Sequence, residues 1–199
     1  MRIAVIGWGS LIWCPGDLAI ASRWKKNGPC LPVEFSRVSN DCRLTLVIAD
    51  GVDTVTTLWA VSEYTEMRAA MDNLRHREGI PDTPWHSNDI GQVAIGDTNV
   101  NQISQTIREW LQELRMDGAI WTALPPKDQY CKQVLMTPDQ AVAYVRGLCP
   151  QAKRRAEEYV RNAPDQIETQ IRKRLRDVFG WENNLLSRVL FEDNQRIEI

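Results

Sequence analysis

The apolar and polar positions in the first third of the chain predict strands. Four segments have a pattern that predicts a strand: residues 2–6, 31–39, 43–49 and 54–62. The first is a short branched apolar run, and the second alternates apolar with polar residues, although the period slips between Phe35 and Val38. Asp50 and Gly51 separate the last two segments and are typical of a hairpin turn. We therefore expect an antiparallel meander.

The period changes to that of a helix after Glu63. Apolar residues then recur at spacings of three and four with charged residues between them, at Tyr64, Met67, Ala70, Met71 and Leu74. This pattern predicts a helix over 63–77 with one buried face. Glu78 and Gly79 should end it, because two prolines follow closely.

Four further elements follow from the same criteria. They are a helix over 100–114, a buried strand over 118–124, a helix opened by Thr137 and Pro138, and a helical segment from Gln151 to Val178 that breaks at Pro164 and closes at Gly180. Threonine caps a helix N-terminus well, and proline suits the first turn.

Length and charge restrict the classes of function. The chain has 199 residues, of which 43% are hydrophobic, enough for one buried core but not for two full domains. A formal net charge of −2, with both signs mixed along the chain, provides no field that would attract nucleic acid or an anionic membrane. We expect neither as a partner.

Cysteines and histidines give no sign of a metal or redox site. The five cysteines are an odd number with no C-x-x-C pair, so we expect reduced thiols and a cytoplasmic protein. The only two histidines, His76 and His86, lack other ligands at metal-binding spacing, so no metal is expected. The apolar N-terminus is interrupted at Gly7 and lacks a signal-peptide cleavage pattern, and no stretch is long enough to span a membrane.

The loop after the first strand, "GWGS" at residues 7–10, is the most unusual local feature. A strand followed by G-x-G can begin a dinucleotide-binding loop, but Ile12 stands where the third glycine belongs and Pro15 interrupts the following helix. A nucleophile elbow would need G-x-S-x-G, which is absent. Both alternatives are therefore disfavoured, although a glycine-rich loop is well suited to present N–H groups.

"VIGWGSLIW" resembles the opening of γ-glutamylcyclotransferases and their relatives, whose first strand runs into a Tyr-Gly-Ser-Leu loop. "LRHREGI" resembles the Glu-Gly at the end of a helix in the same family, and "EFSRVS" and "TLWAVS" lie between them in the family's order. "WTALPP" and "APDQIETQIR" are similar to a microbial branch of the family. The resemblance covers about residues 1–130 and reaches the tail only through that branch.

The resemblance implies site residues. Glu78 falls on the catalytic glutamate, and the substrate-binding loop consists of Gly7, Trp8, Gly9, Ser10 and Leu11. Trp8 departs from the family tyrosine, so any hydrogen bond of that phenol is lost and the usual substrate is in doubt. Arg37 and Arg43 are candidates to pair with a substrate carboxylate, or they face solvent on alternating strands.

The implied reaction needs no cofactor, metal or nucleophilic side chain. The α-amine of a γ-glutamyl group attacks its own γ-carbonyl, forms 5-oxoproline and releases an amine. Holding both groups in one reactive conformer supplies much of the rate, on the order of 7 kcal/mol or more. Glu78 would move the proton, with a pKa raised by burial, and the loop amides would stabilise the carbonyl oxygen.

The resulting prediction is an α+β protein with a small, mostly antiparallel, barrel-like sheet surrounded by helices. Residues 1–150 form the γ-glutamylcyclotransferase-like domain, and residues 151–199 form a helical extension packed on it. The alternative is a non-catalytic protein that binds a ligand or partner on the same fold. The basic residues Arg172, Lys173, Arg174 and Arg176 form either a solvated helix face or a surface for a partner protein.

Overall fold

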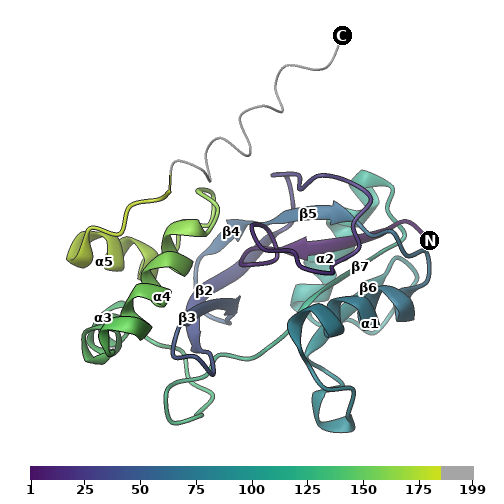
Figure 1. Ribbon diagram of the computed structural model, residues 1–199. Helices are drawn as coiled ribbons and strands as arrows, with labels where there is room; N and C mark the ends of the chain where they lie inside the picture. The colour runs from purple at the N-terminus through teal and green to yellow at the C-terminus, as the bar shows by residue number, and fades with distance from the viewer. Residues whose placement is uncertain (185–199) are drawn as a thin grey trace.

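Two β-sheets and five α-helices form the part of the chain that the structure describes, residues 1–184 of a computed structural model (Figure 1). The first sheet has the strand order β5-β1-β7-β6, with bounds Leu58–Val61, Ile3–Gly7, Gly118–Thr122 and Ile90–Ala94. The second has the order β3-β2-β4, with bounds Leu44–Ile48, Cys30–Val38 and Thr54–Thr56. The helices are α1 (Met67–Glu78), the short 3₁₀ helix η1 (Pro84–His86), α2 (Gln102–Leu114), α3 (Pro138–Gly147), α4 (Pro150–Asn162) and α5 (Gln170–Phe179).

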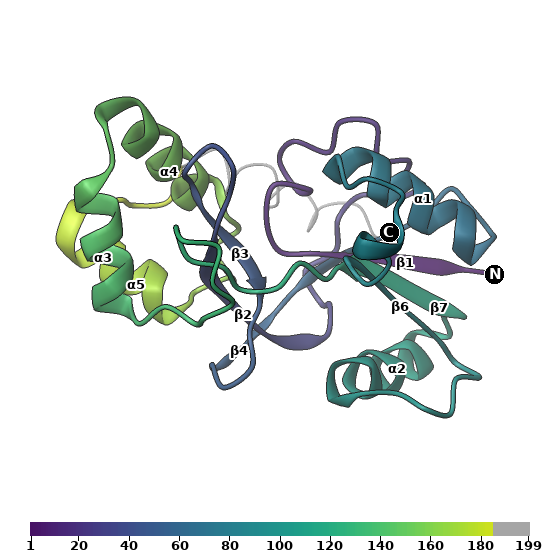
Figure 2. The ribbon, with the colours of Figure 1, turned by 90° about the horizontal axis from the view of Figure 1, so that it is seen from below.

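Helices α1 and α2 cover opposite faces of the first sheet (Figure 2). Strand β1 lies inside this sheet, antiparallel to β5 and parallel to β7. All five residues of β1 are buried, as expected for a strand covered on both faces. The rigid end of β1 is therefore the support from which the first loop starts.

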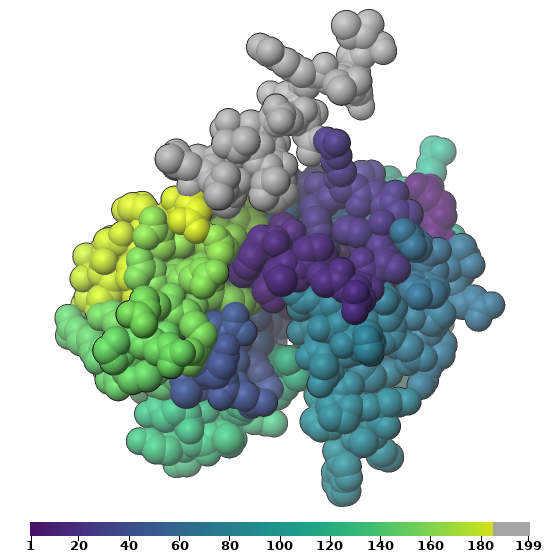
Figure 3. Space-filling model, viewed as in Figure 1, coloured from purple at the N-terminus to yellow at the C-terminus, as the bar shows by residue number. Residues whose placement is uncertain are grey.

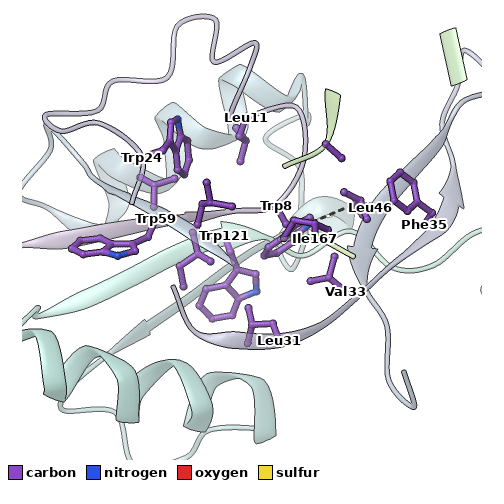
Figure 4. Packing of buried hydrophobic residues seen from close by; sticks show 14 of the residues in the cluster. Trp8, Leu11, Trp24, Leu31, Val33, Phe35, Leu46, Trp59, Trp121 and Ile167 are labelled. Carbon is purple, nitrogen blue, oxygen red and sulfur yellow. Dashed lines mark hydrogen bonds between the residues drawn. The ribbon is translucent and has the colours of Figure 1, made fainter. Parts of the chain in front are cut away.

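Helices α3, α4 and α5 form a second layer beside β2 and β3 (Figure 1). Helix α3 packs mainly on α5, α4 contacts β3, and α5 contacts β2. Large apolar side chains fill the space between the sheets, among them Trp8, Leu31 and Trp121 (Figure 4). The C-terminal helices thus share one core with the sheets.

The predicted helix ends are confirmed where a local signal determines them. Gly79 ends α1 with φ of 65°, a left-handed conformation that glycine adopts without strain. Thr137 caps α3, with its side chain accepting from the N–H of Gln140 while the Gln140 side chain accepts from the N–H of Thr137. Gly180 ends α5 in the same way as Gly79.

The predicted hairpin across Asp50 and Gly51 is wrong. Strands β3 and β4 both pair with β2, β3 along Val33–Val38 and β4 along Cys30–Pro32. Thr57 is fully buried, and its hydroxyl donates to the Pro29 carbonyl oxygen at 2.8 Å. It lies between β4 and β5, where the chain passes from the second sheet to the first.

The α+β class is confirmed, and every strand pair in the described residues except β1–β7 is antiparallel. The strands of this part of the chain form two open sheets and no closed barrel, so the barrel-like sheet remains a prediction. Residues 185–199 of the predicted extension lie outside the described residues. None of the described helices combines the length and the apolar character needed to cross a membrane.

The prediction of one continuous basic face on α5 is wrong for Arg172, which is fully buried. Its guanidinium donates to the carbonyl oxygens of Pro164 at 2.6 Å, Ile167 at 3.0 Å and Ala163 at 2.5 Å. Burial lowers the Arg172 pKa to about 10, which keeps the group charged at neutral pH. Arg172 thus holds the connection between α4 and α5, and a partner protein for the rest of the basic surface remains a prediction.

Candidate functional site

The first loop begins where β1 ends and is fixed by its own side chains. Gly7 packs against the ring of Trp24, which leaves little room for a side chain at this position. Trp8 is buried, and its indole N–H donates to the carbonyl oxygen of Leu46 in β3 at 3.2 Å (Figure 4). The loop then turns back on itself, with the Ile12 N–H donating to the Gly9 carbonyl oxygen at 3.0 Å.

Glu78 reaches the same region from the end of α1. Its side chain is only 17% exposed, and Oε1 accepts from Nη1 of Arg77 at 2.5 Å. Arg77 Nη2 donates to the Ser10 hydroxyl at 3.3 Å and to the Cys14 carbonyl oxygen at 2.5 Å. Arg77, which the sequence analysis did not select, therefore links the end of α1 to the first loop.

A cavity of about 330 Å³ lies between the first loop, the turn from β2 to β3, and α1. Figure 3 shows this region as a cleft below the purple loop, between the blue residues of that turn and the teal helix. The predicted site residues that line it are Trp8, Gly9, Ser10, Leu11 and Glu78. Gly7 lies behind the loop against Trp24 and is not part of the lining. The volume suits a small ligand.

Three cationic side chains line the cavity besides Arg77. They are Arg37, Arg43 and Lys127. A parallel bridge joins the backbones of Arg37 and Lys127, with the Lys127 N–H donating to the Ser36 carbonyl oxygen at 3.0 Å and the Val38 N–H donating to the Lys127 carbonyl oxygen at 2.7 Å. Burial lowers the Arg37 pKa. Glu78 is the only acidic lining residue within residues 1–184, so the cavity favours anionic ligands.

Tyr159 of α4 is the site residue that sequence reasoning missed. It is 7% exposed, lines the cavity and faces Gly9. A Cβ on Gly9 would lie 2.5 Å from the Tyr159 hydroxyl oxygen, so glycine is required there for close approach. One signal in the sequence could have found it. Tyr159 lies on the apolar face of a helix, and a buried phenol needs a polar neighbour, which indicates a polar site next to that face.

The hydroxyl of Thr122 adds a polar group without a partner. This oxygen is buried, its residue lines the cavity, and it makes no hydrogen bond within the described residues. Buried polar atoms are nearly always paired, so the lining can accept a hydrogen bond from a ligand or donate one to it. No cluster of three or more potential metal ligands is present in residues 1–184.

A second cavity of about 710 Å³ is larger but offers less chemistry. It lies beside β6 and β7, and Leu124 belongs to the lining of both cavities. Asp50 is the only charged residue that the described part of the chain contributes to its lining. Because it lacks a paired acid and base, we place the candidate site in the smaller cavity.

No family model, curated protein or solved structure matches this chain. Function must therefore be argued from the geometry of the cavity and from the resemblance of its loop and helix end.

Proposed function

We propose that this protein is a γ-glutamylcyclotransferase-like enzyme that converts a γ-glutamyl amine or peptide to 5-oxoproline and free amine. The observation that carries the proposal is that Glu78 and the loop residues Trp8 to Leu11 line one cavity. These segments are far apart in the sequence, and they are the two that carry the family resemblance.

The proposal extends to the fold and the compartment. We take the two open, mostly antiparallel sheets to correspond to the barrel-like sheet of that family, because the loop follows β1 and the Glu-Gly ends α1 as in its members. We place the reaction in the cytoplasm, because all five cysteines are free and exposed, as is usual in a reducing compartment.

The cationic lining supports binding of the substrate carboxylate. A γ-glutamyl group carries an α-carboxylate, and Arg37 and Arg43 both line the cavity. Arg43 also pairs with Asp41 at 2.8 Å, whereas Arg37 donates to the neutral Pro125 carbonyl oxygen at 2.6 Å and has no carboxylate within ion-pair distance in the described residues. We assign Arg37 to the α-carboxylate and Lys127 to a second anionic group.

The proposed reaction balances with Glu78 as the only proton carrier. The substrate α-amine loses a proton to Glu78 and forms a bond to the γ-carbonyl carbon, which closes the five-membered ring. The bond from that carbon to the departing nitrogen then breaks while Glu78 returns the proton to this nitrogen. Since only Oε1 contacts Arg77, Oε2 is the oxygen assigned to the proton transfer.

The ion pair between Arg77 and Glu78 also favours a second candidate function. A carboxylate held at 2.5 Å by an arginine can serve to fix the loop rather than to move a proton. In that case the protein binds a γ-glutamyl compound or another small anion without converting it.

A direct assay separates the two functions. The purified protein is incubated with a panel of γ-glutamyl amines and dipeptides, and 5-oxoproline and free amine are measured in parallel. We expect Glu78→Gln to bind substrate, measured by calorimetry, and to lower the rate by about 10² to 10⁴-fold, the usual contribution of a general acid or base.

Ser10→Ala is the matched control, because it changes the loop side chain and leaves the backbone amide in place. We expect it to lose much less activity than Glu78→Gln. Binding without turnover by the wild-type protein would support the binding function. Full activity of Glu78→Gln would show that Glu78 is not the proton carrier.

A further inference from the structure

Tyr159 brings a phenol from the C-terminal helices into the candidate active site. Tyr159 lines the cavity together with Glu78 and Ser10. The ring is buried and makes edge-on contacts with Trp13, at a centroid distance of 5.2 Å, and with Phe35, at 6.2 Å. These contacts fix where the hydroxyl lies.

The first loop is shaped to receive this hydroxyl. The missing side chain of Gly9 provides the space in which the Tyr159 oxygen lies. The guanidinium carbon of Arg43 lies 5.4 Å from the centre of the ring. A ring that only filled the core would not need a hydroxyl. Without that hydroxyl it would not need a glycine opposite it, because an apolar ring edge can contact an ordinary side chain.

The surroundings of the hydroxyl make it a donor toward the cavity. Burial, and to a lesser degree the charge of Glu78, raises the Tyr159 pKa to about 12, while backbone hydrogen bonding at Leu46 and Ser10 acts in the opposite direction. The phenol therefore keeps its proton at neutral pH and can donate it in a hydrogen bond to a ligand in the cavity that Tyr159 lines.

We propose that the Tyr159 hydroxyl donates a hydrogen bond to the γ-carbonyl oxygen of the bound substrate. This inference rests on the proposed cyclotransferase function and refines it. The sequence predicted the loop amides as donors to this oxygen, and Tyr159 adds a side-chain donor that lines the same cavity. Tyr159 forms no covalent bond, and its donation strengthens as negative charge develops on the carbonyl oxygen.

The test compares Tyr159→Phe with Tyr144→Phe. Tyr144 is a matched control, because it lies in α3, donates to the Cys42 carbonyl oxygen at 2.9 Å and does not line the cavity. With the best γ-glutamyl substrate of the wild-type protein, we expect Tyr159→Phe to lower kcat by about 10²-fold, the usual loss for one such donor. KM should change little, and Tyr144→Phe should keep full kcat.

A second measurement separates a role in the reaction from a role in packing. Replacing tyrosine throughout the chain with a fluorinated tyrosine makes the phenols more acidic, so loss of kcat at alkaline pH should begin at a lower pH. The same labelling of Tyr159→Phe should show no such shift. A phenol that only supports the fold would leave the pH profile unchanged even where stability changes.

The outcomes distinguish the inference from the function on which it rests. Unchanged kcat in Tyr159→Phe, or an equal loss in Tyr144→Phe, would overturn the role of Tyr159 and leave the cyclotransferase proposal in place. If Tyr159→Phe does not fold, an unchanged pH profile of the fluorinated protein overturns the role by itself. Absence of 5-oxoproline with the wild-type protein would overturn both.

Discussion

Gly9 shows how much one missing side chain contributes to this protein. It was selected from the sequence as part of a loop that presents N–H groups, and the structure adds a second reason for glycine. The Tyr159 hydroxyl oxygen lies only 2.5 Å from the position of a Cβ on Gly9. The contact joins residues that are 150 positions apart in the sequence, so no local pattern could have predicted it.

We expect Gly9→Ala to destabilise the protein by about 1 to 3 kcal/mol, because the added methyl group overpacks a rigid site. Chemical unfolding measures this change. Gly96→Ala is the control, since a Cβ on Gly96 would meet nothing within 4 Å.

The double variant Gly9→Ala with Tyr159→Phe tests the cause. Removing the oxygen leaves the Tyr159 ring carbon Cζ as the nearest atom, at 3.6 Å from the added Cβ, which is an ordinary contact. The double variant should therefore be about as stable as Tyr159→Phe alone. Additive losses in free energy of unfolding would show that the hydroxyl is not what Gly9 accommodates.

Strand β2 and helix α5 are held together by a buried carboxylate. Glu34 in β2 is 3% exposed and accepts from the Thr169 hydroxyl, from the Ile171 N–H at 3.2 Å and from the Phe35 N–H at 2.7 Å. Two of these donors belong to the start of α5, where a negative charge is favourable. Desolvation by burial nevertheless raises the Glu34 pKa above 4.5.

This shift predicts a pH dependence of stability. Because the folded pKa of Glu34 is raised, the folded state binds more protons than the unfolded state above pH 4.5. The contribution of Glu34 is therefore fully present below the unfolded pKa and is lost as pH rises through the folded pKa.

Glu34→Gln should remove that dependence. We expect the variant to be less stable than the wild type by about 1 to 3 kcal/mol, because its amide N–H₂ faces backbone donors. The difference should be largest at acidic pH and shrink as pH rises from 4.5. Urea unfolding at several pH values measures it, and a difference that grows with pH would contradict the assignment.

Elements with local signals were predictable, and those set by distant contacts were not. Gly79 and Thr137 determine helix ends through their own backbone and side-chain chemistry, so the sequence identified them. The pairing of β4 with β2 joins residues 54–56 to residues 30–32, and the burial of Arg172 depends on carbonyl groups at the end of α4. From sequence alone, a charged residue on a helix is predicted to be exposed, because the carbonyl groups that could pair with it are not known.

The candidate site is assembled from the whole molecule. The first loop, the end of α1, strands β2 and β3, the segment after β7 and helix α4 each contribute to the lining of one cavity. The sequence could identify the loop and Glu78 because a family resemblance marked them. It could not identify Arg77, Lys127 or Tyr159 as partners, since each looks ordinary in its own segment.

On the proposed cyclotransferase function, the charge of this cavity predicts selectivity for the leaving amine. γ-Glutamyl compounds whose amine carries a carboxylate should bind better than compounds of equal size whose amine carries a cation. Lys127→Gln should raise KM for the carboxylate compounds by about tenfold, which corresponds to about 1.4 kcal/mol. Added salt should narrow the preference.

Lys173→Gln is the control for that prediction. Lys173 is exposed on α5 and does not line the cavity, so this variant should keep the wild-type KM. Equal KM values for anionic and cationic compounds would show that the basic lining does not contact the leaving amine, and would leave the assignment of Glu78 untouched.

The edge of strand β3 is covered, and this affects whether molecules of the protein associate with one another. Strand β3 lies at the edge of its sheet, and the Trp8 indole and helix α4 lie against it instead of another strand. An uncovered edge strand can pair with a strand of another chain. Any change that detaches α4 therefore removes Tyr159 from the candidate site and uncovers part of the β3 edge in the same step, so loss of ligand binding and self-association should begin together.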